Sequence, residues 1–425
     1  MDSNVLVRRS FTTGYFRIYK KYYLHIIALI GFLIVIQSRT RVVFTTASII
    51  YQYSPNLHNV SHNYTYLMKC PSENSPKHLS VHPHQLVNMI SIVLQSSSLM
   101  YCPVPKIATK TLLNIILYVH VRDLIHHVEN NWTNVSTNRA QIEKMINISA
   151  FIKDLQFNGV VIPKSEMPKS AVEFLHMYLN ILQFGTINTS SSSKLINPWR
   201  LRFTFAFPYF RLNNLPSLAE IFTPSFNRVI FVRHPFERLA SAYKERIATL
   251  AKDRIEPEPE YDAMRTEICQ QRVVSQRVRS LRPTQDSCMH TVPSFEDFLR
   301  YILTITHIPN GIARMNYHWQ PYSVLCQVCK FKYNFIGKYE MFNDDLSRFL
   351  KLYNISNWNI ERRNGASGLS KRDYQAYYDT LPDDLICELI KLYRDDMRLF
   401  KYRIEDYVNR TTLFQNCKWL TSALS

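Results

Sequence analysis

The sequence predicts an α/β fold in which helices flank a mostly parallel central sheet. Three short apolar segments, 98–104, 228–232 and 333–337, are each followed by a segment with the spacing of an amphipathic helix. Strands that alternate with helices are typical of parallel sheets, because each parallel connection needs a crossover. At 425 residues and 46% hydrophobic content, the chain can fold and bury a large core.

The chain begins with an apolar segment that we expect to anchor it in a membrane. Tyr22–Ile36 is apolar apart from His25, and basic residues lie on both sides. It is shorter than the roughly 20 residues that span a bilayer, but flanking Lys and Arg side chains can reach the interface. Because the preceding region is long and basic and Gln37–Arg41 makes a poor cleavage site, an uncleaved anchor is favoured over a cleavable signal peptide or a buried core helix. We expect a cytosolic tail (1–21), a transmembrane anchor (22–38), a lumenal stem (39–95) and a folded domain (96–425).

Two features suit a lumenal location for the residues after the anchor. Eight N-x-S/T glycosylation sequons follow the apolar segment and none precedes it. All eight cysteines also follow it, and an even number suits disulfides in an oxidising compartment, although no pairing can be predicted. The sequons begin at Asn59, Asn63, Asn131, Asn134, Asn147, Asn188, Asn354 and Asn409.

The first strand–helix unit follows the stem. Leu86–Leu94 has helical spacing, and Ser98–Val104 predicts a short buried strand that runs into a loop. Apolar residues from Leu112 to Leu124 then recur at helical spacing. The segment 130–193 carries four sequons and a serine run, so we expect it to be a surface excursion or a partly independent insert.

Two further units have the same order. Arg228–Val232 predicts a second strand, followed by an amphipathic helix over 236–250. Tyr333–Gly337 predicts a third strand, followed by a helix over 344–352. Pro382–Phe400 predicts a C-terminal helix. Its first turn carries two aspartates, whose negative charges interact favourably with the helix dipole.

Basic and hydroxyl side chains follow the first two predicted strands. Lys106 and Lys110, with two threonines, lie where the first strand gives way to its helix, and Arg233 ends the second strand. Ligands bind beyond the carboxyl ends of parallel strands, and a helix N-terminus favours an anion. Either turn alone could be a basic surface turn. Together, with Ser241 in the second helix, they indicate a ligand with two separated phosphate groups.

The composition narrows the classes of function. The chain has only 8 glycines and no cluster of three, which argues against a Walker phosphate loop, a dinucleotide fingerprint or a kinase. A net charge of +18 attracts polyanions, which include nucleic acid, anionic lipid and acidic glycan. The predicted anchor and the sequons argue against nucleic acid.

Three blocks of sequence resemble the Golgi carbohydrate sulfotransferases of the chondroitin/dermatan type, in sulfotransferase family 2. Their order and approximate spacing agree, and the resemblance covers roughly 99–402. The blocks are Cys102–Lys106 with Thr109–Thr111, Phe231–Tyr243, and His318–Pro321 with Cys326, Cys329 and Tyr333–Glu340. The resemblance implies a P-loop-NTPase-like sulfotransferase fold and a single-pass type II Golgi membrane protein with a lumenal catalytic domain. It also implies transfer of a sulfuryl group from 3′-phosphoadenosine 5′-phosphosulfate to a glycosaminoglycan, above all to N-acetylgalactosamine of chondroitin.

The resemblance further assigns roles to the two turns. The loop for the 5′-phosphosulfate of the donor would comprise Pro105, Lys106, Ile107, Ala108, Thr109, Lys110 and Thr111. The 3′-phosphate would be held by the turn comprising Arg233, His234, Pro235, Phe236, Glu237, Arg238, Leu239, Ala240 and Ser241. The chain departs from the family at Ala108 (usually Gly), Lys110 (Thr), Thr111 (Asn or Ser) and His234 (often Asp). These departures leave open a non-catalytic, membrane-anchored glycan-binding protein with a degenerate donor site.

We expect two catalytic residues, Lys106 and His318. Lys106 would neutralise the leaving 5′-phosphate, and His318 would take the proton of the acceptor hydroxyl. The alternatives are a structural role for His318 and a base at Glu237 or Glu340. His318 with the nearby C-x-x-C supplies at most three metal ligands, so disulfides are favoured and no metal is expected. The expected lining for an acidic glycan is Arg272–Arg282, Arg362, Arg363 and Lys371.

Overall fold

The structure is a computed structural model that describes residues 91–94, 97–130, 164–184, 218–250, 259–275, 291–356 and 370–410, with Cys70 and a few other single positions. The chain divides into the units 1–55 and 56–425, and the first unit lies outside the described residues. The predicted anchor (22–38), six of the eight sequons and the basic residues 276–282, 362 and 363 also lie outside them. Within the described ranges, no helix is both long and apolar enough to span a membrane.

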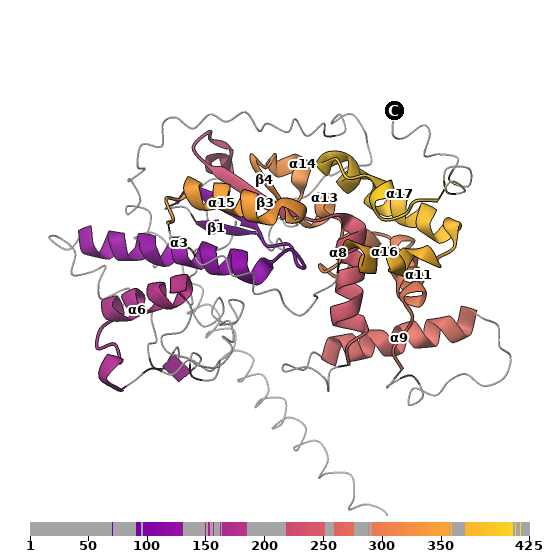
Figure 1. Cartoon of the computed structure of the whole chain (residues 1–425), viewed down its shortest axis with the longest axis horizontal. Coiled ribbons are helices and arrows are strands. Elements are labelled where there is room, and N and C mark those ends of the chain that lie inside the picture. The colour runs from indigo at the N-terminus through magenta and orange to yellow at the C-terminus, as the bar shows by residue number, and fades with distance from the viewer. Residues whose placement is uncertain are drawn as a thin grey trace, which may run out of the picture. The chain divides into compact units, whose positions relative to one another are not determined.

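A four-stranded sheet lies at the centre of the domain, in the order β1-β2-β3-β4 (Figure 1). The strands are β1 (Ile92–Leu94), β2 (Leu99–Cys102), β3 (Asn227–Val232) and β4 (Phe335–Lys338). β3 is parallel to both β2 and β4, whereas β1 is antiparallel to β2. The sheet is therefore mixed, and the predicted parallel part is confirmed for β2, β3 and β4. The carboxyl ends of these three strands lie at one edge of the sheet.

The helix predicted for Leu86–Leu94 is wrong at its end, because Ile92–Leu94 form strand β1. All three residues are buried, and they pair with Leu99–Tyr101 across a tight connection in which Ser98 has a φ of 47°. A short apolar run fits a buried strand as well as a helix, and strand pairing decides between them here. The sheet therefore begins inside the segment that we expected to be stem.

One group of helices packs with the sheet. The long helix α3 (Thr109–Asn130) packs with α6 (Ala171–Phe184), and α15 (Phe342–Leu352) packs against β4 (Figure 1). Helix α6 lies within 130–193, which we expected to be a surface excursion or a partly independent insert, and Phe174 and Tyr178 are fully buried and join the core. Their spacing of four residues places both rings on one face of the helix. Helix α6 therefore contributes to the core, and an insert over 130–193 stays a prediction.

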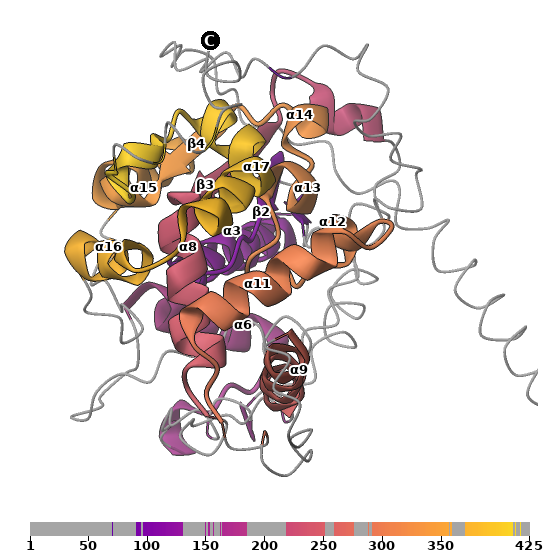
Figure 2. The same ribbon diagram turned by 90° about the vertical axis from the view of Figure 1, so that its right-hand side faces the viewer.

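A second group of helices has a hydrophobic core of its own. These helices lie to one side of the sheet in Figure 1 and in front of it in Figure 2. Helix α8 follows β3 and changes into a π-helix where the sequence predicted a continuous helix to residue 250. The helices are α8 (Pro235–Ala242), the π-helix η6 (Tyr243–Ile247), α9 (Pro259–Ser275), α11 (Phe295–Thr306), α16 (Lys371–Asp379) and α17 (Asp383–Phe400). Short helical turns are α12 (Gly311–Arg314), α13 (Tyr322–Leu325), α14 (Val328–Phe331), η2 (Lys164–Glu166), η5 (Leu218–Phe222), η8 (Tyr339–Met341) and η9 (Ile404–Asp406).

All eight cysteines form disulfides, as the sequence predicted. The pairs are Cys70–Cys329, Cys102–Cys326, Cys269–Cys288 and Cys387–Cys417. The two cysteines of the C-x-x-C sequence are not paired with each other. Instead, Cys326 joins the end of β2 and Cys329 joins Cys70, so segments far apart in sequence are held together.

Removing the Cys102–Cys326 disulfide by a double substitution to alanine is expected to lower the free energy of unfolding by about 2–5 kcal/mol. This disulfide joins residues 224 positions apart. Its loss enlarges the closed loops of the unfolded chain, although Cys70–Cys329 still links the same two regions. Guanidinium unfolding followed by tryptophan fluorescence measures the change. The matched control removes Cys269–Cys288, which joins residues only 19 positions apart. An equal or larger loss in the control would contradict the expectation.

Candidate functional site

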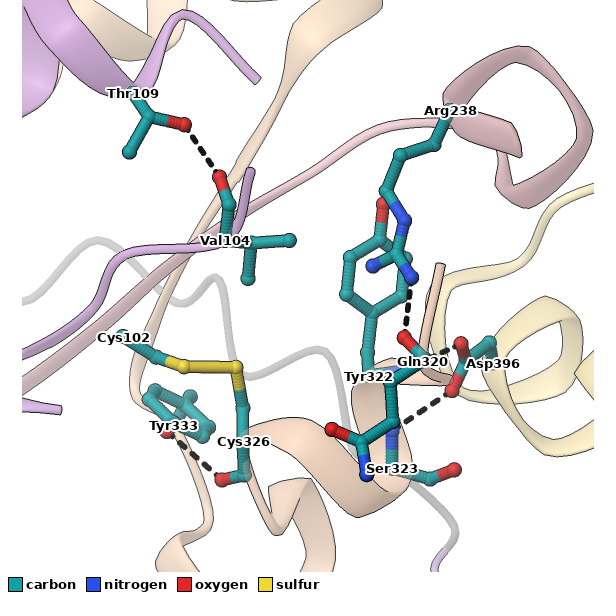
Figure 3. Close-up of a disulfide and its surroundings, with 10 residues drawn as sticks. All are labelled: Cys102, Val104, Thr109, Arg238, Gln320, Tyr322, Ser323, Cys326, Tyr333 and Asp396. Carbon is teal, nitrogen blue, oxygen red and sulfur yellow. Dashed lines mark hydrogen bonds between the residues drawn. A yellow bond between two sulfur atoms is a disulfide. The ribbon is translucent and has the colours of Figure 1, made fainter. Parts of the chain in front are cut away.

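The loop between β2 and α3 has a backbone suited to binding an anion. Lys106 and Ala108 both have left-handed conformations, with φ of 71° and 48°. Such turns can align successive N–H groups into an anion-binding concavity, and the first N–H groups of α3 have no acceptor within the helix. The Thr109 hydroxyl donates to the carbonyl of Val104 at 2.5 Å and closes the loop (Figure 3). Thr109 therefore shapes the loop that sequence analysis expected it to line.

Ala108 occupies a backbone conformation that favours glycine. Glycine is the residue that the sequence comparison with the family led us to expect there. A left-handed conformation costs an alanine roughly 1–2 kcal/mol, because its Cβ crowds the following carbonyl.

Substituting Ala108 with glycine is expected to stabilise the folded protein by about 1 kcal/mol and to raise its midpoint of thermal unfolding. Gly also loses more chain entropy on folding, which offsets part of the gain. Differential scanning calorimetry measures the shift. Ala108→Val is the opposing variant, since a β-branched residue tolerates a positive φ poorly. A lower midpoint for Ala108→Gly than for the wild type would rule out strain at this residue.

Arg233 connects the turn after β3 to the loop after β2. Its Nη1 donates to the carbonyl oxygen of Lys106 at 3.1 Å, and its Nη2 donates to Glu237 Oε1 at 2.5 Å. The guanidinium lies between the rings of Tyr339 and Tyr374, 4.4 and 4.9 Å from their centroids. Burial lowers the pKa of Arg233, but the charge and hydrogen bond of Glu237 outweigh it and hold the pKa above its usual value. The two predicted turns are therefore physically joined by a permanent cation.

His234 caps the helix that follows it. Its Nδ1 accepts from the backbone N–H of Phe236 at 3.2 Å, and its Nε2 donates to the carbonyl of Arg403 at 2.9 Å. Burial lowers the pKa of His234 to about 4, so the ring is neutral at neutral pH. Asp is a preferred N-cap residue. His234 thus supplies a side-chain acceptor at the position where the family often has Asp.

Folding stability is expected to fall as the pH drops below about 6.5, the unfolded pKa of histidine. Because burial lowers the folded pKa of His234 to about 4, the unfolded chain binds the proton first. The free energy of unfolding is therefore at its full value above pH 6.5, and about 3 kcal/mol is lost as the pH falls to 4. Burial lowers the pKa of His120 to about 3, which acts in the same direction.

Urea unfolding from pH 7.5 to pH 4 measures this slope. His234→Asn keeps a capping acceptor and does not titrate, so its slope is expected to be flatter. An unchanged slope in His234→Asn would show that His234 does not contribute.

Lys106 reaches the π-helix through an ion pair. Its ammonium group pairs with Glu245, and the Lys106 side chain is only 7% exposed. Arg246 Nη2 lies 3.6 Å from the other oxygen of Glu245. The Arg246 guanidinium in turn lies 5.3 Å from the ring centroid of Tyr261 on α9. These contacts lead from the loop after β2 to Tyr261, which contacts the predicted base His318.

His318 is buried and belongs to the same series of contacts. Its Nδ1 lies 3.0 Å from the hydroxyl of Tyr261 and 2.9 Å from Asn316 Oδ1. The backbone N–H of His318 donates to this same oxygen of Asn316 at 3.0 Å, which fixes the orientation of the amide. We assign the ring proton to Nδ1, which can then donate to the Asn316 oxygen, and this assignment leaves the basic lone pair on Nε2.

Several predicted site residues lie in the core or on the surface instead. Arg238 is buried against the ring of Tyr322 and donates to the carbonyl of Gln320, beside Asp396 (Figure 3). Lys110 is exposed and Thr111 is half-buried. The fully buried side chains of Phe236, Leu239 and Ala240 pack in the second core, and Pro105, Ile107, Pro235 and Ser241 are also buried.

The two alternative bases are engaged in holding other groups. Glu237 Oε2 accepts from the hydroxyl of Tyr407, and its other oxygen holds Arg233. Glu340 accepts from the backbone N–H of His234 at 2.8 Å and from Tyr402 at 3.1 Å. Burial raises the pKa of Glu340. Their positions favour a structural role for both carboxylates.

The aromatic and acidic neighbours of the two turns were not predicted from the sequence. Tyr339 lies in the third sequence block, which could have identified it, whereas Tyr374 and Tyr261 come from helices far away in sequence. Glu245 follows the second block by only two residues, but nothing in the sequence shows that a π-helix turns it toward Lys106. Among the described residues, no group of three or more His, Cys, Asp or Glu side chains could hold a metal ion.

The residues of the site fit a ligand with phosphate groups. A buried ammonium, a buried guanidinium and a left-handed loop lie together at the carboxyl ends of β2 and β3. Arg233 Nε is buried and has no hydrogen-bond partner among the residues that the structure describes. An anionic oxygen could satisfy this donor.

Comparisons with known proteins identify the family of the chain. A family model described as "Sulfotransferase family" matches residues 91–403. Carbohydrate sulfotransferase 11 of Rattus norvegicus is 26% identical over 204 residues, which cover 46% of this chain and 54% of that protein. Carbohydrate sulfotransferase 12 of Xenopus laevis is 27% identical over 249 residues, which cover 57% and 53%. Carbohydrate sulfotransferase 14 of Danio rerio is 27% identical over 180 residues, which cover 41% and 43%. The chain thus spans about half the length of these relatives, and no solved structure matches it.

Proposed function

Because the chain belongs to the sulfotransferase family, we propose that it transfers a sulfuryl group from 3′-phosphoadenosine 5′-phosphosulfate to a hydroxyl group of a glycan. The observation that carries this proposal is the hydrogen bond from Arg233 Nη1 to the Lys106 carbonyl, at 3.1 Å. It makes one site of two turns that each suit an anionic group. A donor with a phosphate at one end and a phosphosulfate at the other matches such a site.

The chain's own residues supply positioning and charge. The donor supplies an activated sulfuryl group, and such transfers depend on in-line positioning and on stabilising the leaving oxygen. Lys106 and the first N–H groups of α3 would hold the 5′-phosphate and neutralise charge that develops on it. Arg233 would hold the 3′-phosphate. Nε2 of His318 would accept the proton of the acceptor hydroxyl.

We propose chondroitin as the acceptor, with N-acetylgalactosamine as the sulfated sugar. The three relatives described above share the name carbohydrate sulfotransferase, and the net charge of +18 would draw an acidic glycan to the enzyme. Of the basic residues expected to line the acceptor site, Lys371 is exposed at the start of α16.

We also propose that the chain is a type II Golgi membrane protein, anchored by residues 22–38. Four disulfides suit an oxidising lumen. Of the eight sequons, Asn354 and Asn409 lie within the described residues, and both are exposed, as glycosylation requires.

Sulfate transfer by the purified full-length chain tests the proposal. The chain is incubated with donor carrying radiolabelled sulfate and with desulfated chondroitin, dermatan or heparosan, and the labelled product is digested to disaccharides. Label in N-acetylgalactosamine of chondroitin is expected. Label only in heparosan would overturn the acceptor assignment. Binding of a glycan without any transfer would favour the non-catalytic alternative.

A further inference from the structure

Glu245 contacts two cations, of which only one belongs to the proposed donor loop. It pairs with Lys106 through one carboxylate oxygen, and the other oxygen lies 3.6 Å from Arg246 Nη2. The Glu245 side chain is 57% exposed, whereas Lys106 is 7% exposed. The carboxylate therefore lies on the solvent side of the lysine, where an incoming ligand would arrive.

The position of Glu245 depends on the π-helix Tyr243–Ile247. A π-helical turn holds one residue more than an α-helical turn, so the side chains after it are rotated by about 100° around the helix axis. Such turns are frequent at functional sites. A buried arginine on α9 holds this conformation. Arg265 Nη1 donates to the carbonyls of Arg246 and Thr249 at 2.8 and 3.1 Å. The direction of Glu245 toward Lys106 is thus built into the fold.

Both ends of Lys106 are held before any ligand binds. Arg233 holds its carbonyl oxygen, and Glu245 holds its ammonium group. A phosphosulfate group beside Lys106 would bring negative charge close to the Glu245 carboxylate. The two anions would repel each other and compete for the same ammonium.

We propose that Glu245 is a positioning residue. Its carboxylate holds the Lys106 ammonium until the sulfate donor binds and takes the place of the carboxylate. This inference rests on the proposed function of the loop. When the donor pairs with the Lys106 ammonium, Arg246 remains as the partner of Glu245. The Glu245 carboxylate therefore has a cation beside it both with and without bound donor. Glu245 then weakens donor binding by competition and contributes nothing as a base.

Glu245→Gln is expected to tighten binding of the donor and of its product, adenosine 3′,5′-bisphosphate. Removing one charge a few ångströms from the ligand at a half-exposed position changes binding by about tenfold at low salt. The gain shrinks as salt is added, because exposed charges are screened. The fold is expected to persist, because glutamine keeps a side-chain oxygen that can accept a hydrogen bond from the Lys106 ammonium, whose side chain is only 7% exposed.

Isothermal titration of adenosine 3′,5′-bisphosphate into the full-length chain tests this inference, together with the donor KM and kcat. The matched control is Glu388→Gln on α17, which removes the same charge from an exposed ion pair with Lys391. We expect Kd and KM to fall about tenfold in Glu245→Gln at low salt and to be unchanged in Glu388→Gln.

Two outcomes would overturn the inference. One is unchanged or weaker binding in Glu245→Gln. The other is a large fall in kcat at constant KM, which would make Glu245 the base. Failure of the wild-type chain to bind the bisphosphate would instead refute the proposed function itself.

Discussion

Replacing Lys106 with alanine is expected to lower kcat for sulfate transfer by about 10²–10³-fold. The ammonium group is nearly buried at the loop that would hold the leaving phosphate, so its charge acts in a partly desolvated place. Alanine would leave the developing charge without its cation. The fold is expected to persist, because the remaining partner, Glu245, is 57% exposed and can be solvated by water.

The measurement is steady-state kinetics with radiolabelled donor at saturating acceptor. Lys110→Ala removes the same charge from the same segment, but Lys110 is exposed at the start of α3. Its effect on kcat is expected to be much smaller. Equal effects of Lys106→Ala and Lys110→Ala would show that general charge, and not the position of Lys106, sustains transfer.

Replacing Arg233 with alanine is expected to abolish binding of adenosine 3′,5′-bisphosphate and to destabilise the fold by about 3–5 kcal/mol. Arg233 is 3% exposed and is paired with Glu237, so its removal leaves a buried carboxylate without its cation. It also frees the carbonyl of Lys106, which releases the loop after β2. Both effects act on the donor site.

The double variant Arg233→Ala/Glu237→Gln separates the two effects. Neutralising Glu237 removes the unpaired charge, so thermal unfolding is expected to return part of the way to the wild-type midpoint. Binding, measured by isothermal titration, is expected to stay at least 100-fold weaker, which is about 3 kcal/mol. Recovery of binding together with stability would assign Arg233 a structural role only.

Much of the fold could be predicted, because the spacing of apolar residues along the sequence agrees with the strands and helices of the structure. The three apolar segments before Lys106, Arg233 and Tyr339 became parallel strands, and the helices after them have their apolar faces buried. The membership in sulfotransferase family 2 is confirmed, and the blocks around Lys106, Arg233 and His318 carried that prediction. Strand β1 was not predicted because a short apolar segment does not show which strand it pairs with. Helix α6 was not predicted because the sequons around it indicated surface and not a packing partner.

The details of the site could not be predicted, because they depend on contacts between distant segments. The sequence does not show that Arg233 would use its guanidinium to hold Lys106 and Glu237, or that His234 would cap α8. Thr109 and Arg238 were expected to face the donor, but one closes the loop and the other lies in the core. The contact of Glu245 with Lys106 depends on the π-helix, which the sequence did not predict.

The central claim is that the loop of Lys106 and the turn of Arg233 bind the two ends of one donor. The most direct test compares Kd for adenosine 3′,5′-bisphosphate, adenosine 5′-phosphate and adenosine 3′-phosphate, by isothermal titration into three forms of the chain. These are the wild type, Lys106→Ala and Arg233→Ala/Glu237→Gln. The wild type should bind the bisphosphate most tightly. Lys106→Ala should lose the contribution of the 5′-phosphate alone. The Arg233 variant should lose most of the contribution of the 3′-phosphate and a smaller part of that of the 5′-phosphate, because the Lys106 carbonyl also loses its hydrogen bond. Equal losses for both phosphates in either variant, or no binding by the wild type, would contradict a two-ended donor site.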